Sequence, residues 1–460
     1  MQARYMRGTC VVQASGKREW ALDSRGRMLD TCRRPIRCGQ RMYHVTQLQN
    51  GLTVATAEMP HMLSVSVGLW IGVGSRYEPP ELNGVCHFIE HLLFKGTKRR
   101  SAKEISEAVE GIGGYLNAFT SEEMTCFHAR ACHDRFDELL DVLLDMRLDS
   151  RFDPVEIGKE REVIKEEMAM YLDEPQHHVQ ELLNATMWPD QPLGRPITGT
   201  EQTLDAMTRA QLVGYLRENY VPANTLIVAA GRLKHRQVAR AVARYGRRFR
   251  PHDSPRFTPA RSGQRASKIH LFTKKTEQTQ IALGIRTCSR EDKRRYALRL
   301  LNTILGENMS SRLFQVVRED RGLAYSIYST PSFFGDVGDL VISAGLDTGN
   351  LTKTLRLIAR ELRRMREAVP SAAELRRAKD YVIGQIDLSL ESTDNQMNWL
   401  GEQLLGYGRI FRPAEVKRRL REVTAGEIRA VARDFLRPER LNLALVSPLK
   451  SANRLAGLLK

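Results

Sequence analysis

The chain has 460 residues, 42% of them hydrophobic, and its 71 Lys and Arg against 54 Asp and Glu give a formal net charge of +17. This length predicts two or three domains, and the apolar fraction excludes a chain that is disordered throughout. No apolar run reaches the roughly 18–20 residues that a bilayer span needs, so we expect no membrane span. Seven cysteines, an odd number spread thinly over the chain, favour a reducing compartment over a disulfide framework.

The first 41 residues carry a disproportionate share of the positive charge. They hold ten Lys and Arg but three Asp and Glu, which gives this segment a net charge of +7. Such a segment is typical of a disordered basic extension, of an organellar transit peptide, or of a non-native stretch upstream of Met42, where domain-like sequence begins. Elsewhere basic and acidic residues alternate in helical stretches such as 355–382, which indicates solvated helix faces. We therefore expect no nucleic-acid partner, and a location in the bacterial cytoplasm with the mitochondrial matrix as the alternative.

From residue 42 onward the sequence predicts folded elements. The hydrophobic patterns indicate, in chain order, strands over 51–57 and 65–73, helices over 83–94 and 102–112, strand over 115–131, and helices over 134–148 and 153–172. Residues 251–267 contain three Pro and three Ser without apolar periodicity, which predicts a linker. The linker separates a first domain over 42–250 from a second over 268–460.

These two domains look like one unit used twice. Thr208–Asn224 aligns with Thr424–Arg440 without a gap, and in each segment a helix runs into a Pro and then an apolar strand. The strand-like residues 65–74 and the helix after them likewise correspond to 279–286 and a helix over 296–305. This correspondence predicts an α+β fold made of two duplicated domains.

The clearest chemical motif is HFIEH at residues 87–91. Because residues four apart on a helix lie about 40° apart around its axis, His87 and His91 project from one face. Two neutral imidazoles so placed can bind one Zn²⁺, and Glu90 beside them can accept a proton from a water that attacks a carbonyl. A chance occurrence is the alternative, because a catalytic zinc site needs a third protein ligand.

A helix over residues 155–172 offers that third ligand. On a helical wheel, Glu160 and Glu167 flank the apolar face, whereas Glu162 and Glu166 point to the solvent. Carboxylates on the buried side of a helix are costly unless they bind a metal or are paired. In a helix so rich in Glu, placement by chance is again the alternative.

Taken together, these segments resemble a known family. HFIEHLLFKGT (87–97) followed by EREVIKEEMAMYLDEP (160–175) is similar to the pitrilysin/insulinase-type zinc metallopeptidases. The resemblance is closest to the branch that holds the β subunit of mitochondrial processing peptidase and its single-chain bacterial relatives. WPDQPLGRPITGTEQTL (188–204) is another run typical of that family, and the resemblance extends over about 42–450.

The resemblance implies a zinc site in the first domain. The family's third ligand lies about 76 residues after the second histidine, which here is Glu167, and a glutamate important to the site lies seven residues before it, at Glu160. One Zn²⁺ per chain would then be held by His87, His91 and Glu167, with Glu90 as the general base.

The resemblance also implies where a peptide would bind. GGYLNAFTSEEMT (113–125) resembles the family's active-site edge strand, whose Asn-Ala pair faces the substrate backbone; here these residues are Asn117 and Ala118. In the second domain, MSSRLFQVVREDRGLAYSIYS (309–329) resembles a substrate-binding segment, with Arg318 meeting substrate carbonyls. Tyr325 in the same segment would donate a hydrogen bond to the developing oxyanion.

The family fold implies two domains, each a mainly antiparallel sheet flanked by helices, that close as a clamshell around the active site. The second domain has no HxxEH where the first has one, so we expect it to be non-catalytic. Where relatives have a Gly-rich LGGGMSSRLF, this chain has LGENMSSRLF, a departure that removes no proposed catalytic residue. Cys86 is expected to pack in the core, and His177 and His178 are expected on the surface.

These inferences predict a zinc-dependent endopeptidase that hydrolyses peptide bonds of unfolded or short peptides. Its expected assembly is a homodimer or a heterodimer with an inactive paralogue. The alternative hypothesis is a non-catalytic, processing-peptidase-like assembly or peptide-binding subunit, although such subunits usually lack parts of the metal motif.

Overall fold

The computed structural model describes residues 42–261 and 263–459, together with four short strands in the first 41 residues. These strands form a small antiparallel sheet: β1 (Tyr5–Met6), β2 (Thr9–Val12), β3 (Trp20–Leu22) and β4 (Met28–Leu29). The chain divides into two compact units, 1–44 and 45–460. The predicted basic extension lies for the most part outside the described residues and stays a prediction.

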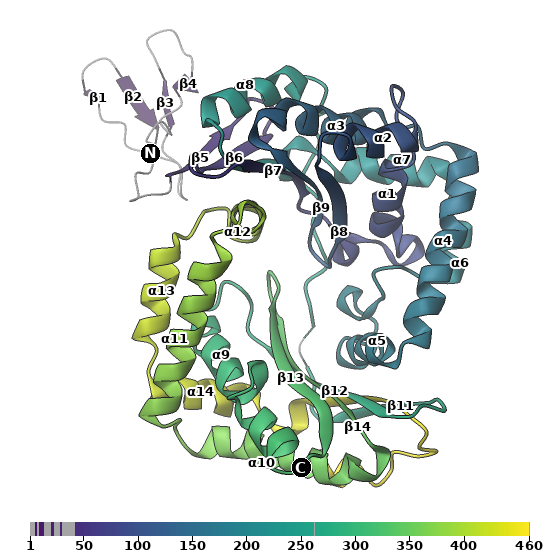
Figure 1. Cartoon of the computed structure of the whole chain (residues 1–460), viewed down its shortest axis with the longest axis vertical. Coiled ribbons are helices and arrows are strands. Elements are labelled where there is room, and N and C mark those ends of the chain that lie inside the picture. Colours follow the sequence, from purple (N-terminus) through teal and green to yellow (C-terminus); the bar gives the residue numbers. More distant parts are fainter. Residues whose placement is uncertain are drawn as a thin grey trace. The chain divides into compact units, whose positions relative to one another are not determined.

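The first half of the larger unit is built around a six-stranded sheet (Figure 1). Its strands are β5 (Met42–Gln47), β6 (Thr53–Glu58), β7 (Ser64–Ile71), β8 (Tyr115–Thr120), β9 (Thr125–Cys132) and β10 (Thr225–Gly231). Their order in the sheet is β5-β6-β10-β7-β9-β8, which places β8 at one edge. Strands β6 and β10 are parallel, and the pairs β10–β7, β7–β9 and β9–β8 are antiparallel.

Eight helices accompany this sheet among the described residues. They are α1 (Val85–Leu93), α2 (Ala102–Glu110), α3 (Phe136–Asp149), α4 (Pro154–Asp173), α5 (Pro175–Met187), α6 (Glu201–Ala206), α7 (Arg209–Asn219) and α8 (His235–Gly246). The long helix α4 begins where Asp153 accepts a hydrogen bond from Val155 N and Pro154 occupies the first helical position, where its missing N–H costs nothing. Apolar faces of α1, α3 and α7 pack with the sheet into one buried core.

The second half repeats this plan with a five-stranded sheet. Its strands are β11 (Lys268–Thr273), β12 (Thr279–Thr287), β13 (Ala324–Phe333), β14 (Gly338–Leu346) and β15 (Leu441–Ser447). The order β11-β15-β12-β14-β13 matches β6-β10-β7-β9-β8 position by position, including one parallel pair beside antiparallel ones. The predicted α+β fold of duplicated, mainly antiparallel sheets flanked by helices is therefore confirmed.

Helices of the second half are α9 (Arg295–Asn302), α10 (Leu351–Glu367), α11 (Ala372–Ser389), α12 (Thr393–Tyr407), α13 (Pro413–Glu422) and α14 (Ala425–Phe435). The aligned segments noted in the sequence are equivalent in structure. In each, a Thr caps the helix through a capping box, at Thr208 for α7 and at Thr424 for α14, and a Pro-initiated turn leads into β10 or β15. No helix in the described part of the chain is both long enough and apolar enough to cross a membrane.

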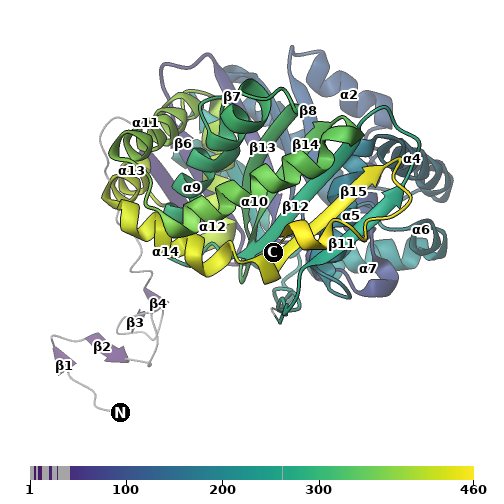
Figure 2. The same ribbon diagram turned by 90° about the horizontal axis from the view of Figure 1, so that it is seen from below.

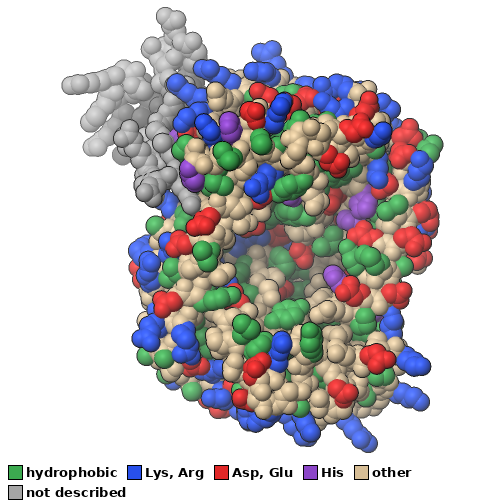
Figure 3. All heavy atoms as spheres, in the orientation of Figure 1, with side chains coloured by type: hydrophobic (Ala, Val, Ile, Leu, Met, Phe, Trp, Pro, Cys, Tyr) green, Lys and Arg blue, Asp and Glu red, His purple; other side chains and the backbone are tan. Residues whose placement is uncertain are grey.

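Each half contributes one helix that packs on the sheet of the other half. Helix α12 of the second half packs on β6, β7 and β10, and α5 of the first half packs on β11, β12 and β15 (Figures 1 and 2). The contact at α12 is close, because a Cβ added at Gly401 would overlap the buried ring of Trp70. Between the two sheets the space-filling view shows a hollow, as expected of a clamshell (Figure 3).

One prediction of local structure was wrong. Residues 115–131 form a hairpin of β8 and β9 rather than a single strand, because the segment SEEM at 121–124 turns the chain. The turn is closed by a 2.8 Å hydrogen bond from Ser121 N to Met124 O, and the Ser121 hydroxyl donates to the same carbonyl. The turn contains neither Gly nor Pro, so the usual turn signals are missing from the sequence.

Candidate metal centre

Helix α1 places the HFIEH motif on one wall of a cavity. The helix follows Gly84, whose positive φ of 95° and close approach to Thr198 O leave no room for a Cβ. Its apolar residues, among them Phe88 and Ile89, are fully buried in the core. The opposite face therefore carries both histidines, and the ring centroids of His87 and His91 lie 4.6 Å apart.

Helix α4 brings a carboxylate to these imidazoles. Oε2 of Glu167 lies 3.7 Å from Nε2 of His87 and 3.6 Å from Nε2 of His91. Two ligands about 2.0–2.1 Å from a tetrahedral ion lie roughly 3.4 Å apart, close to these separations. Among the described residues this trio is the one group of His, Cys, Asp or Glu whose ligand atoms all lie within 4.8 Å of one another. The donor set of two imidazoles and a carboxylate fits Zn²⁺.

The protonation states of two of these side chains also suit a metal. Burial lowers the pKa of His87 to about 4, so its imidazole is neutral at pH 7. The hydrogen bond with His91 holds the pKa of Glu167 down at about 2, so its carboxylate is ionised. Burial alone would lower the pKa of His91, but hydrogen bonds with Glu167 and Glu160 outweigh it and raise that pKa. Metal ligands must be deprotonated, so a proton on His91 competes with the ion.

A second set of side chains orients the candidate ligands. Glu160 is buried, and its Oε2 lies 3.1 Å from Nδ1 of His91, while Lys95 Nζ lies 2.8 Å from its Oε1. The hydroxyl of Tyr171 donates a 2.6 Å hydrogen bond to Oε1 of Glu167, which leaves Oε2 directed at the histidines. Such outer partners fix the tautomer of a ligating histidine and the orientation of a ligating carboxylate.

Glu90 lies on the same wall as the candidate ligands. Its Oε2 accepts a 2.5 Å hydrogen bond from the hydroxyl of Thr120, at the end of β8. Burial raises the pKa of Glu90, although the Thr120 hydrogen bond acts in the opposite direction. The cavity has a volume of about 610 Å³ and also receives His87, Glu167 and Tyr171. A carboxylate with a raised pKa beside three candidate ligands is suited to proton transfer.

The helical wheel of α4 is confirmed. Glu160 is buried and Glu167 half-buried, whereas Glu162 and Glu166 are exposed. Of the predicted edge-strand pair, Ala118 lines the cavity, and Asn117 is exposed and accepts a 2.8 Å hydrogen bond from Ala118 N through its own side chain. Strand β8 is an edge strand, as expected.

Arg318 and Tyr325 lie together in the second half, away from the cavity lining. The guanidinium carbon of Arg318 is 5.5 Å from the ring centroid of Tyr325, whose side chain is 76% exposed. The structure therefore brings the two residues together but does not bring either to the histidines. Their roles toward a substrate stay predictions.

Three further expectations concern residues near the site. Cys86 is fully buried beside Tyr215, as predicted for a packing residue. His177 is exposed and stacks on Tyr171, with ring centroids 5.2 Å apart. The expectation that His178 lies on the surface was wrong: it is buried and packs edge-on against Phe272 of β11, because α5 packs on the sheet of the second half.

Sequence analysis missed three residues that contact the site. Thr120 was within a segment singled out for its Asn-Ala pair, and Lys95 within the segment after the histidines. Tyr171 was within the segment 160–175 that carries the family resemblance. Its position four residues after Glu167 is the signal that was available, because residues four apart on a helix are neighbours.

The chain matches two models of one family. Residues 53–201 match the family described as Insulinase (Peptidase family M16), and residues 206–382 match the Peptidase M16 inactive domain. The second match agrees with the absence of an HxxEH motif after residue 91.

Relatives and solved structures agree with this assignment. A protein of Streptomyces coelicolor named as a zinc protease is 39% identical over 88% of this chain and 89% of its own length. The zinc protease YmxG of Bacillus subtilis is 37% identical over 87% of this chain and 97% of its own. A crystal structure of a Helicobacter pylori protease has the same fold, with a TM-score of 0.83 at 21% identity over 88% of this chain and 99% of that one. A putative M16-like peptidase from Alicyclobacillus acidocaldarius gives a TM-score of 0.77 at 18% identity, over 88% and 98%.

The match of both halves to models of one family and the similarity to bacterial zinc proteases over 87–88% of this chain lead to one conclusion. The chain belongs to the insulinase family of zinc metallopeptidases, peptidase family M16.

Proposed function

We propose that this zinc peptidase is an endopeptidase that cleaves unfolded or short peptides, with His87, His91 and Glu167 as zinc ligands and Glu90 as the general base. The observation that carries the proposal is that both Nε2 atoms face the same oxygen of Glu167, beside Glu90 in one cavity. When bound there, zinc supplies a Lewis acid that polarises a peptide carbonyl and lowers the pKa of water toward about 7.

The protein's own groups perform the proton transfers. Glu90 accepts the proton of the attacking water and passes it to the leaving amine, and its raised pKa brings it closer to the range of an efficient general base. Thr120 fixes the carboxylate of Glu90 through Oε2. Glu160 holds His91 in the tautomer whose Nε2 is free to act as a ligand.

The open edge of β8 supports an extended peptide as substrate. Strand β8 pairs with β9 along one side, and its other side is the edge of the sheet next to the cavity that Ala118 lines. A peptide added to this edge gains main-chain hydrogen bonds that depend little on its side chains. Unfolded chains and short peptides can adopt this extended form, whereas folded proteins cannot.

Arg318 and Tyr325 belong to the proposal as groups of the second half. Tyr325 projects into the solvent and is in contact with the Arg318 guanidinium. When the halves close on a peptide, Arg318 would meet a substrate carbonyl and Tyr325 the developing oxyanion. Asn117 would face the peptide backbone from β8.

The test compares zinc content and cleavage of a quenched, unstructured peptide in the wild type and Glu90→Gln. We expect about one zinc per chain in both proteins, and a kcat at least 10²-fold lower in the variant, because a general base contributes about 10²–10⁴-fold. Glu166→Gln is the matched control, since Glu166 lies on α4 but is exposed and points away from the cavity.

Two outcomes would overturn the proposal. If wild type binds zinc and no peptide is cleaved, the assembly-subunit alternative takes its place. If Glu90→Gln and Glu166→Gln cleave equally well, Glu90 is not the base. The expected assembly is a homodimer or a heterodimer with an inactive paralogue, and size-exclusion chromatography with light scattering on the same samples tests for the homodimer. The relatives are bacterial, which favours a bacterial compartment over the mitochondrial matrix.

A further inference from the structure

A second cavity lies in the first half, lined by none of the residues that line the zinc cavity. It has a volume of about 860 Å³ and is enclosed by the end of α3, one face of α7 and the segment 248–252 that follows α8. Two arginines come from each of these three regions: Arg147 near the end of α3 and Arg151 just after it, Arg209 and Arg217 of α7, and Arg248 and Arg250 of the segment after α8. Lys98 adds a seventh cation, and Glu218 is the one carboxylate in the lining.

The floor of this cavity contains a half-buried arginine, Arg147. Arg147 lies between the buried rings of Tyr220 and Phe249, with its guanidinium carbon 5.7 and 5.9 Å from the two centroids. One Nη of Arg147 donates a 2.5 Å hydrogen bond to Tyr220 O, but its Nε is buried and has no acceptor. Burial lowers the pKa of Arg147 to about 10. A buried cation with an unused donor is costly, and an anion would offset that cost.

The arginines above this floor have few partners. Arg209 donates to the backbone carbonyls of Phe152 and Arg151. The side chains of Arg151, Arg217 and Arg250 form no ion pair or hydrogen bond with any residue that the structure describes. Asp149 lies 2.6 Å from Arg248 and 3.8 Å from Lys98. Asp149 and Glu218 together therefore offset two of the seven positive charges.

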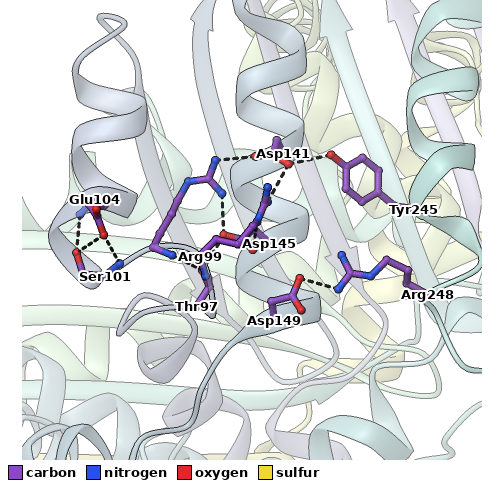
Figure 4. Close-up of polar contacts among 10 residues, drawn as sticks. Thr97, Arg99, Ser101, Glu104, Asp141, Asp145, Asp149, Tyr245 and Arg248 are labelled. Atoms are coloured by element: carbon purple, nitrogen blue, oxygen red, sulfur yellow. Dashed lines mark hydrogen bonds and ion pairs between the residues drawn. The ribbon is translucent and has the colours of Figure 1, made fainter.

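One and two turns before Asp149, helix α3 carries Asp145 and Asp141, and the arginines beside these two carboxylates are fully paired. Arg99 and Arg100 each bond both Asp141 and Asp145, at 2.6–2.9 Å, and Tyr245 donates to Asp141 (Figure 4). In the same view Asp149 accepts a hydrogen bond from Arg248. The unpaired arginines around the cavity thus contrast with a neighbouring cluster in which every guanidinium has carboxylate partners.

Helix dipoles account for part of this arrangement. The C-terminal ends of α3 and α7 both meet the cavity, and a helix C-terminus carries about −0.5 elementary charge that favours cations. This favours the arginines in the last turns of the two helices, Arg147 of α3 and Arg217 of α7. It does not explain Arg151 and Arg250, which lie beyond the ends of α3 and α8 and whose side chains bond no carbonyl of the described chain.

We propose that this cavity binds a small ligand that carries several linked phosphate groups. Arginine forks match phosphate oxygens in pairs, and a cluster with about five uncompensated cations favours a ligand with several negative charges over a single ion. The volume falls within the range of small-molecule sites. The proposal is independent of the zinc site and of the proposed peptidase activity.

The test is isothermal titration calorimetry of the full-length protein with sodium tripolyphosphate in 50 mM NaCl. The pocket variant carries Arg217→Gln and Arg250→Gln, two exposed residues that fix no backbone. The control carries Arg356→Gln and Arg363→Gln, two exposed arginines of α10 that are likewise without an ion pair in the described structure. Because both variants lose two positive charges, the difference between them is the position of the lost charges.

We expect tripolyphosphate to bind wild type, to bind the pocket variant at least tenfold more weakly, and to bind the control within twofold of wild type. Orthophosphate should bind at least tenfold more weakly than tripolyphosphate. ATP as a second probe separates two sources of the same chemistry: equal affinity indicates recognition of the phosphates alone, and higher affinity indicates a nucleotide. A rise in the melting temperature with tripolyphosphate, lost in the pocket variant, gives a readout that needs no peptidase activity.

Several results would overturn the proposal. These are no binding of tripolyphosphate at millimolar concentration, equal losses in the pocket and control variants, or equal affinity for orthophosphate. A short RNA that binds more tightly than tripolyphosphate, and loses its affinity in the pocket variant, would assign the cavity to nucleic acid instead. Arg147→Lys tests the residue on the floor of the cavity: we expect it to bind tripolyphosphate more weakly than wild type does.

Discussion

The hydroxyl of Thr120 donates a 2.5 Å hydrogen bond to Oε2 of Glu90, which links the edge strand β8 to helix α1. Thr120 is the last residue of β8, the strand on which we expect a peptide to lie. The proposed general base and the proposed substrate strand are therefore held by one hydrogen bond. Any shift of β8 would change the position of the Glu90 carboxylate.

Thr120→Val removes this hydrogen bond and keeps the shape of the side chain. A hydrogen bond to a charged group contributes about 1.5–3 kcal/mol, so we expect kcat to fall by roughly 10- to 100-fold. Zinc content should not change, because Thr120 contacts no candidate ligand. Thr120→Ser, which keeps the hydroxyl, should stay within a few-fold of wild type. Steady-state kinetics with the quenched peptide checks this, and equal kcat values for the Val and Ser variants would contradict it.

Tyr171→Phe tests the group that orients the third ligand. The Tyr171 hydroxyl bonds Oε1 of Glu167 at 2.6 Å, and losing an outer partner of a zinc ligand typically costs about 10–100-fold in metal affinity. We expect a loss of that size in a competition titration with a chromophoric chelator. Tyr245→Phe is the matched control, since its hydroxyl also bonds a carboxylate, Asp141, at 2.9 Å but far along the chain from the zinc ligands. Equal affinity in the two variants would remove Tyr171 from the site.

Sequence alone could predict the parts of the site that depend on a single helix. His87, Glu90 and His91 follow from the period of one helix, and the buried side of α4 that holds Glu160 and Glu167 follows from another. The duplication was also visible, because both copies keep a capped helix, a Pro and an apolar strand. Zinc and the family follow from these motifs and are borne out by the relatives.

Features that depend on contacts between distant elements could not be predicted. Thr120 and Glu90 are 30 residues apart, and no periodic pattern relates a strand end to a helix face. His178 is buried because α5 packs on the sheet of the other half, so its own helix gives no sign of it. Tyr171 makes both apolar and polar contacts, because its ring stacks on His177 while its hydroxyl bonds Glu167. A tyrosine can therefore be expected in the core or at a polar site.

A buried ion-pair cluster joins the two halves beside the β8–β9 turn. Glu123 forms ion pairs with Arg76, at 2.7 Å, and with Arg290 of the second half, and it accepts a 2.9 Å hydrogen bond from Gly335 N. The side chains of Glu123, Arg76 and Arg290 are each at most 11% exposed. Removing the carboxylate takes the acidic partner from the buried Arg290, while Arg76 keeps its ion pair with Asp336 at 2.6 Å. Loss of one partner from a buried ion pair costs about 3–5 kcal/mol. We expect Glu123→Gln to lower the thermal unfolding midpoint by several degrees.

The control for this prediction is an exposed ion pair of the same half. Glu138 bonds Arg135 at 3.1 Å, but both side chains are more than 40% exposed. Such a pair contributes at most about 1 kcal/mol, so Glu138→Gln should change the midpoint little. Differential scanning calorimetry of both variants decides the matter: similar midpoints would mean that the buried cluster does not hold the halves together.

The last prediction concerns pH and a buried carboxyl group in β14. Asp339 is 5% exposed, and its Oδ1 has no hydrogen-bond partner. Burial, opposed by hydrogen bonds with Ser332 and assisted by the charge of Glu122 of the first half, raises its pKa from 3.8 to about 7. Because the folded state then holds a proton that the unfolded state releases near pH 4, the free energy of unfolding falls as pH rises from about 4 to about 7. Each pKa unit is worth about 1.4 kcal/mol, so the upper limit of this loss is about 4 kcal/mol.

Asp339→Asn removes the titration while keeping the shape of the side chain. We expect the variant to match wild type near pH 4 and to become more stable than wild type above pH 7, by up to about 4 kcal/mol. Asp380→Asn, at an exposed position on α11, should leave the pH dependence of wild type unchanged. Urea unfolding at pH 4.5, 6 and 8 measures the difference between variant and wild type, so titrations common to both cancel. If the free energy of unfolding changes with pH in the same way for Asp339→Asn and wild type, Asp339 is ionised in the folded protein at neutral pH.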